Sequence, residues 1–143
     1  MPVIPLANGL INLCGNANGG TVPLLGAFIG CNYTDLNGTP VWSPRWPGTA
    51  AVFAGTEATA MVASHPDQLF LINCNAAISD IDVHRNTGQS LGELDVATLN
   101  STAALNLRIV GFSEEPSSDD AVVAGRLAIV KLNNHFYNAL AGI

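Results

Sequence analysis

The feature that most constrains this fold is the alternation of side chains, with a period of two, in the second half of the chain. In residues 105–112, LNLRIVGF, a leucine or isoleucine occupies every second position from 105 to 109. Residues 67–74, DQLFLINC, alternate in the same way, with two leucines on the side opposite a phenylalanine, an isoleucine and a cysteine. A period of two is that of a β-strand, so both segments are predicted to be strands.

Further strands are predicted on either side of these two. Residues 126–132, RLAIVKL, are apolar on both faces, which is typical of a strand in the middle of a barrel or sandwich. Residues 49–55 and 58–64 are short strand candidates separated by a Gly-Thr-Glu turn. An alanine-rich stretch that begins at Asp95 can hold one helical turn with this aspartate as its cap. We therefore expect an all-β fold, a small β-barrel or β-sandwich with little helix.

The first 48 residues differ from the rest. Residues 1 to about 30 carry no charge, are rich in Gly and Asn, and place their apolar residues with neither helical nor strand period. Such a segment needs cover, so it either lies across its own domain or docks as an extended arm on a neighbouring subunit. The sequence thus suggests an N-terminal arm and loop over 1–48, followed by the β-domain over 49–143.

The proline-rich stretch TPVWSPRWPGT, residues 39–49, is predicted to be a loop, because its prolines favour extended or turn backbone. Trp42 and Trp46 bracket Arg45 there. Rings in this arrangement could form a stacking platform for a sugar or a cation-π contact with the arginine. More often, large rings on such a loop cover their own core or are buried in a protein interface.

Charge and cysteine content exclude several classes of function. Five Lys and Arg stand against eleven Asp and Glu, a net charge of -6, and without a basic stripe nucleic-acid binding is not expected. The start, MPVIPLANGL, has no Lys or Arg, and polar residues interrupt its apolar stretches, so we expect neither a signal peptide nor a membrane anchor. Cys14, Cys31 and Cys74 match no CxxC motif and are expected to be reduced thiols.

The histidines offer the candidate reactive groups. If SDIDVH were a strand, Asp80, Asp82 and His84 would share one face and could hold a divalent ion, although the adjacent arginine disfavours this and a solvated edge strand is the simpler interpretation. His65 has Asp67 two residues on, but His-Pro-Asp is also an ordinary turn before a strand.

The histidine of NNHFYN is interpreted as structural. Asn133, Asn134 and His135 follow a predicted core strand, where they can hydrogen-bond loop backbone that would otherwise lack partners. No potential catalytic partner lies near them in the sequence. We therefore expect no catalytic residue, no cofactor-binding residue, no cofactor and no metal site.

Four segments, in order, resemble small capsid decoration, or cement, proteins of tailed bacteriophages: SHPDQLFLINC, NTGQS, LNLRIVGF and AIVKLNNHFY. Members of that family commonly end in a strand that reads roughly Val-Lys-Ile-Asn-Asn-His followed by an aromatic residue or Gln. The similarity covers residues 64–137, its last segment is the most specific, and it does not extend to residues 1–48.

The resemblance implies a structural virion protein with a β-barrel or β-sandwich core. Such a protein, made in the bacterial host cytoplasm, binds the outer surface of the capsid and stabilises contacts between major capsid protein subunits. We expect no enzymatic activity, and a homotrimer with a dimer as the second choice. Candidate capsid or inter-subunit contacts are the apolar and aromatic residues of the first 48: Leu6, Leu10, Ile11, Leu13, Leu24, Leu25, Trp42, Arg45 and Trp46. The alternative is a virion surface module that binds host carbohydrate through the Trp42/Trp46 loop.

Overall fold

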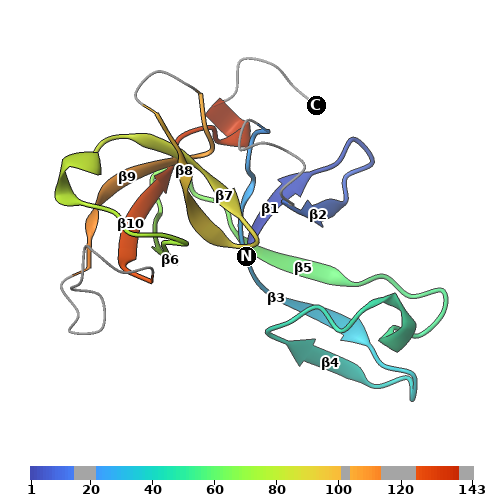
Figure 1. Ribbon diagram of the computed structural model, residues 1–143. Coiled ribbons are helices and arrows are strands. Elements are labelled where there is room, and N and C mark those ends of the chain that lie inside the picture. The colour runs from blue at the N-terminus through green and yellow to red at the C-terminus, as the bar shows by residue number, and fades with distance from the viewer. Residues whose placement is uncertain (15–21, 101–103, 114–124, 139–143) are drawn as a thin grey trace.

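The computed structural model describes residues 1–14, 22–100, 104–113 and 125–138. Within these ranges the chain forms two five-stranded antiparallel sheets and three short 3-10 helices, η2 (Thr49–Ala51), η3 (Asp80–Asp82) and η4 (Phe136–Asn138) (Figure 1). The prediction of an all-β fold with little helix is confirmed. The two sheets are compatible with a sandwich, and neither closes into a barrel.

The sheet formed by the second half of the chain, which we call the curled sheet, has the strand order β6-β10-β9-β7-β8. Its strands are β6 (Leu69–Asn73), β7 (Asn86–Ser90), β8 (Glu93–Asn100), β9 (Leu107–Phe112) and β10 (Leu127–Leu132). It curls until its two edge strands approach each other, and a single isolated bridge joins Cys74 to Leu94. The contact is too short to close the sheet.

The predicted alternation is visible in the burial of the curled sheet. Leu107 and Ile109 are buried in the core, whereas Arg108 and Val110 point outward. β10 lies between β6 and β9, which confirms its predicted interior position. Asn106 is an exception, because it is fully buried although its neighbours on the same side of the pattern are exposed.

The other sheet is built around one long strand, β3 (Gly26–Thr34). One edge of β3 pairs first with β1 (Pro2–Pro5) and farther along with β4 (Pro40–Ser43), and its other edge pairs with β5 (Thr59–Ala63). We call residues 26–63 the blade, because β3, β4 and β5 project together away from the curled sheet (Figure 1). The blade contributes no side chain to the buried core cluster of the described residues.

The N-terminal segment is largely part of the chain's own fold and is not a free arm. β1 and β2 (Ile11–Leu13) form a hairpin, and Val3 is buried. Leu24, also buried, donates its backbone N–H to the carbonyl of Asn134 at 2.9 Å and accepts a hydrogen bond from Phe136 N–H at 2.8 Å. Two alternatives were considered for residues 1–30, packing on the chain's own domain or docking on another subunit. The first therefore applies to the β1–β2 hairpin and Leu24.

The boundary suggested at residue 48 does not coincide with a structural boundary, because β5, which follows it, pairs with β3, which precedes it. The loop predicted over residues 39–49 is also corrected, because this stretch begins with β4. Pro40 is the first residue of this edge strand, one of the few strand positions where a missing N–H costs nothing.

Three other local predictions are wrong. The proposed strand over 49–55 contains the 3-10 turn η2 instead. The proposed helical turn at Asp95 is the middle of β8, where Thr98 and Thr87 share a hydrogen bond of 3.2 Å between their hydroxyls and fix the strand pairing. The proposed strand SDIDVH contains η3 and a turn. In the last two cases weak local propensity is overruled, by the β7–β8 hairpin and by the capping box of η3.

Candidate functional site

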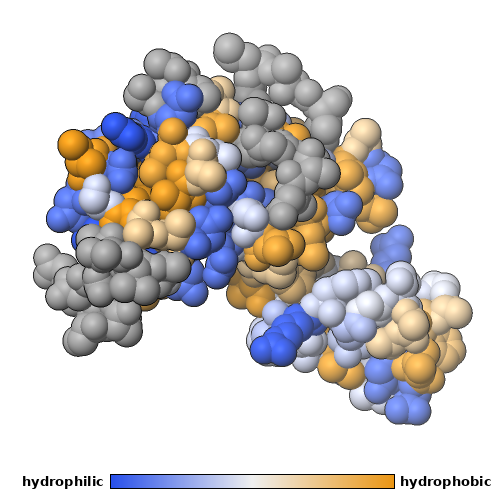
Figure 2. Space-filling view, viewed as in Figure 1, coloured by the Kyte–Doolittle hydropathy of each residue, from blue (hydrophilic) through white to orange (hydrophobic). Residues whose placement is uncertain are grey.

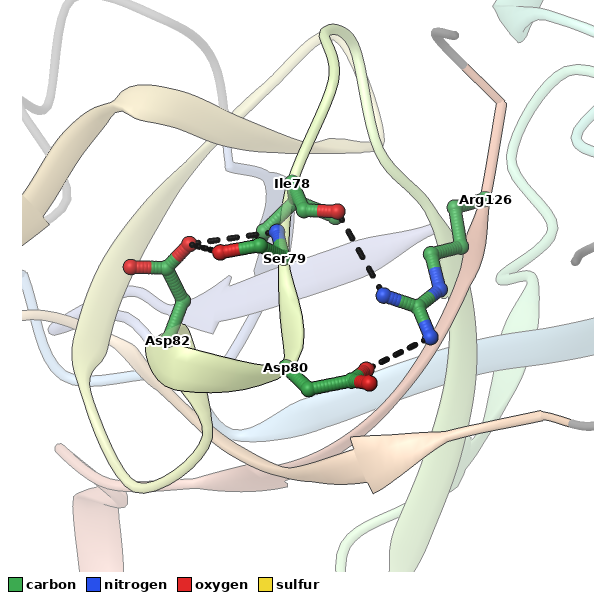
Figure 3. Close-up of polar contacts among 5 residues, drawn as sticks. All are labelled: Ile78, Ser79, Asp80, Asp82 and Arg126. Carbon is green, nitrogen blue, oxygen red and sulfur yellow. Dashed lines mark hydrogen bonds and ion pairs between the residues drawn. The ribbon is translucent and has the colours of Figure 1, made fainter. Parts of the chain in front are cut away.

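The side chains of Asp80 and Asp82 in SDIDVH point to different partners (Figure 3). Asp82 accepts hydrogen bonds from the backbone N–H and hydroxyl of Ser79 at 3.2 and 3.3 Å, which makes a capping box around η3. His84 is exposed with a φ of 71°. The shared face expected for Asp80, Asp82 and His84 is therefore wrong. In the described ranges no group of three or more His, Cys, Asp or Glu side chains is placed to hold a metal ion.

Asp80 belongs instead to a cluster around Arg126 (Figure 3). The guanidinium donates to the Asp80 carboxylate at 2.7 Å and to the carbonyl of Ile78 at 3.4 Å, and its carbon lies 3.9 Å from the centre of the Phe112 ring. These contacts tie the η3 loop to the start of β10. Two charge-assisted bonds and a cation-π contact restrain this arginine, so its role is structural.

His65 forms a turn before β6 and is not oriented by a carboxylate. Its Nδ1 accepts a hydrogen bond from the Asp67 backbone N–H at 3.2 Å. The Asp67 carboxylate accepts instead from Lys131 Nζ at 2.5 Å, and this hydrogen bond, together with the lysine's charge, lowers the pKa of Asp67. The ion pair between Asp67 and Lys131 thus links the turn at His65 to β10.

His135 follows the end of β10 and is fully buried. Its Nδ1 accepts from the Tyr137 N–H at 3.1 Å, while Nε2 has no hydrogen-bond partner among the residues that the structure describes. Asn133 donates its side-chain amide to the Leu105 carbonyl at 3.0 Å. Together with the bridge from Leu24 to His135, these bonds hold the N-terminal segment against the curled sheet.

The three thiols are free and buried. Burial raises the pKa of Cys74 to about 11, Arg126 opposes part of this rise, and Glu93 adds to it. Burial also raises the pKa of Cys31. A raised pKa leaves little thiolate at neutral pH, so neither thiol is poised as a nucleophile.

The predicted contact residues divide into an exposed and a buried group. Leu24 is wholly buried, which corrects its assignment as a contact, and Leu6, Ile11 and Leu25 are half-buried. The exposed members lie in two places. Leu10 and Leu13 lie on the β1–β2 hairpin, and Trp42, Arg45 and Trp46 lie on the blade.

Much of the apolar surface of the blade, visible as orange patches in Figure 2, was not predicted from the sequence. Four further large apolar side chains of the blade are exposed: Ile29, Leu36, Phe53 and Met61. Phe53 and Met61 lie in segments predicted to be strands, and Ile29 lies in the uncharged N-terminal segment. The signal that could have separated them is the paucity of charge between residues 26 and 63, which suggests a surface that does not face water alone.

A small apolar hollow of about 110 Å³ lies between the curled sheet and the sheet of β1 and β3. Met1, Gly26, Phe70 and Leu107 are among its lining residues. Its volume is well below the ~300 Å³ at which small-molecule sites begin, so the hollow reflects imperfect packing between the two sheets.

No protein-family model, curated protein or solved structure gives a significant match to this chain. None of the helices in the described ranges has the length and apolar character needed to span a membrane.

Proposed function

We propose that this chain is a structural virion protein that binds the outer surface of a bacteriophage head and stabilises contacts between major capsid protein subunits. The observation that carries the proposal is the segment AIVKLNNHFY, which resembles the closing strand of capsid decoration proteins. The geometry supports it, because Asn133 and His135 are engaged in joining segments of the fold. The proposal assigns no catalytic residue and no cofactor.

The β1–β2 hairpin is the surface that we assign to the capsid. Leu10 is 62% exposed and Leu13 is 47% exposed, and Figure 1 shows the turn of the hairpin pointing away from the curled sheet. Its base is firmly held, because Gln89 donates its side-chain amide to the Cys14 carbonyl at 2.7 Å. Exposed apolar side chains on a hairpin whose base is fixed can bind with little loss of conformational freedom.

The small area of these two leucine side chains implies multivalent binding. Burying ~200 Å² of apolar surface at ~25 cal/mol/Å² gives a gross ~5 kcal/mol, part of which is lost in association. Closed oligomers multiply weak contacts of this kind. We propose a homotrimer, with a dimer as the second choice, located on the virion surface after synthesis in the bacterial host cytoplasm.

The first test is the protein content of phage particles from the source of this chain. Particles purified by density gradient should contain the chain in copy numbers comparable to those of the major capsid protein, as measured by quantitative mass spectrometry. Its absence from purified particles, with its presence in the lysate, would overturn the proposal.

The second test separates the hairpin from the rest of the molecule. A Leu10→Ser/Leu13→Ser variant should sediment with stripped heads much less than the unmodified chain, because both exposed leucines are lost. Ile81→Ser is the matched control, since Ile81 is exposed on η3, away from the hairpin. Equal loss of binding in the control variant would contradict the assignment of the hairpin.

A further inference from the structure

One side of the blade carries a tryptophan among neutral polar side chains. Across β3, Asn32 pairs with Trp42 of β4 and with Thr59 of β5, and Gly30 pairs with Met61. Directly paired residues of antiparallel strands project on the same side, and so do residues two apart in one strand. These five residues therefore form one surface, which we call the Trp42 face.

The indole of Trp42 lies over Gly30. A Cβ atom built at Gly30 would come within 3.1 Å of Cζ2 and 3.2 Å of Nε1 of the indole. A Cβ there would project outward from the sheet, so the ring occupies the space that the glycine leaves open above β3. Trp42 remains 54% exposed. The ring thus rests on the backbone and presents much of its surface to water.

Polar groups without partners lie beside this ring. Asn32 and Thr59 are exposed, and neither side chain is hydrogen-bonded to any part of the chain that the structure describes. The amide can donate and accept, and so can the hydroxyl. No member of the Trp42 face is charged, in a chain whose net charge is -6.

We propose that the Trp42 face binds a neutral saccharide. The electron-rich face of an indole attracts the weakly positive C–H groups of a pyranose ring, and contact between them removes apolar surface from water. Adjacent strands lie ~4.8 Å apart, so a sugar ring on Trp42 brings its hydroxyls to Asn32 and a second ring toward Thr59. Neutral hydroxyls suit this surface better than a carboxylate or phosphate, because no cation is present in it.

This site differs from the platform of two tryptophans considered from the sequence. Among the described residues, the ring contacts involve only His135, Phe136 and Tyr137, and the cation-π contact involves only Arg126. Trp42 and Trp46 therefore do not stack on each other, and Arg45 does not lie over either ring. Trp46, 47% exposed and outside the Trp42 face, becomes the natural control.

The test is a titration of the full chain, labelled with ¹⁵N, with cellobiose, lactose and chitobiose as probes. At least one disaccharide should give saturable shifts of the Trp42 indole N–H and the Asn32 side-chain amide. Trp42→Ala and Asn32→Ala should each weaken the apparent affinity by about tenfold or more, whereas Trp46→Ala should leave it unchanged. The backbone spectrum of each variant reports whether it remains folded.

Two results would overturn the proposal. One is the absence of any saturable shift at Trp42 with all three disaccharides, or shifts elsewhere that persist in Trp42→Ala. The other is a Trp42 signal that responds to the concentration of the protein itself and not to saccharide, which would make this face a contact between copies. Either result would leave the proposed binding to phage heads untouched, because that rests on the hairpin.

Discussion

The curled sheet and the blade are built from similar strands but differ in what they bury. The core cluster includes residues of β8, β9 and β10, residues of β6 pack against it, and no member of it lies in the blade. In the blade the only buried residues are Gly26, Gly30 and Cys31. Burial of apolar surface provides most folding free energy, so stability resides in the curled sheet, while the blade offers surface for recognition.

The largest expected effect tests this division directly. Ile109→Ala removes a fully buried side chain from the curled sheet and should lower the free energy of unfolding by ~2–5 kcal/mol, measured by urea denaturation. Ile29→Ala in the blade is the matched control and should cost less than ~1 kcal/mol, because Ile29 is 55% exposed. Equal costs would mean that the blade is as important to stability as the core.

A second variant targets the base of the blade. A Cβ at Gly26 would come within 2.1 Å of the Ala63 carbonyl oxygen, so Gly26→Ala should force β3 and β5 apart at a cost of ~1–3 kcal/mol. Hydrogen exchange should show lost protection in β5 and retained protection in β9 and β10. Gly111→Ala, where a Cβ meets no atom within 4 Å, is the control. Uniform loss of protection would show that the two regions unfold as one unit.

Alkaline pH should act mainly on the curled sheet. The pKa of Cys74 is raised from its ordinary value of 9.0 to about 11 in the folded state. The contribution of this protonated thiol to the free energy of unfolding is therefore fully present below pH 9 and is lost as the pH rises through 11. Between pH 8 and 10 the loss should be about 1 kcal/mol, and Cys74→Ala should lack it. The same pH dependence in the variant would assign the loss to other groups.

Thiol labelling distinguishes the two regions by rate. Iodoacetamide at pH 8, followed by peptide mass spectrometry, should modify Cys31 in the blade several times faster than Cys74 in the core, because local opening of the blade costs less free energy. All three cysteines should be labelled without reductant once the protein is unfolded. A crosslink between Cys14 and Cys31 would contradict the expected reduced state.

The smallest effect concerns an exposed ion pair. Asp67 is largely exposed, and Lys131 lowers its pKa, so the contribution of the pair is present at neutral pH and is lost as the pH falls through the lowered value. Lys131→Ala should move the pKa of Asp67 back toward 3.8, as measured by carboxyl NMR, with no resolvable change in unfolding. A large destabilisation would show that the turn at His65 matters more than its exposure indicates.

The sequence predicts strands where alternation and burial coincide, as in β6, β9 and β10. It fails in two different ways. Asp95 lies in a strand because β7 and β8 form a hairpin, and Gly92 in the turn between them is a local signal that was overlooked. Leu24 is buried because it meets His135, and this pairing between distant residues leaves no local signal.

The Trp42 face could be predicted only in part. The sequence indicates a tryptophan platform, but Asn32 and Thr59, which lie beside Trp42, come from β3 and β5. Their position depends on the register of β3, in which a bulge lies between Phe28 and Gly30. A shift of one residue would move Asn32 to the opposite side, so no argument from composition could find this site.

The bridge between Leu24 and His135 has a consequence for the order of folding. The two residues are separated by nearly the whole described chain, so the loop that their pairing closes is among the longest that the fold contains. During synthesis on the ribosome, Leu24 must wait without its partner until residues 134–136 have emerged. Native contacts of such long range slow folding and leave apolar segments unprotected in the meantime. Nascent chains that lack their last residues are therefore expected to depend on chaperones.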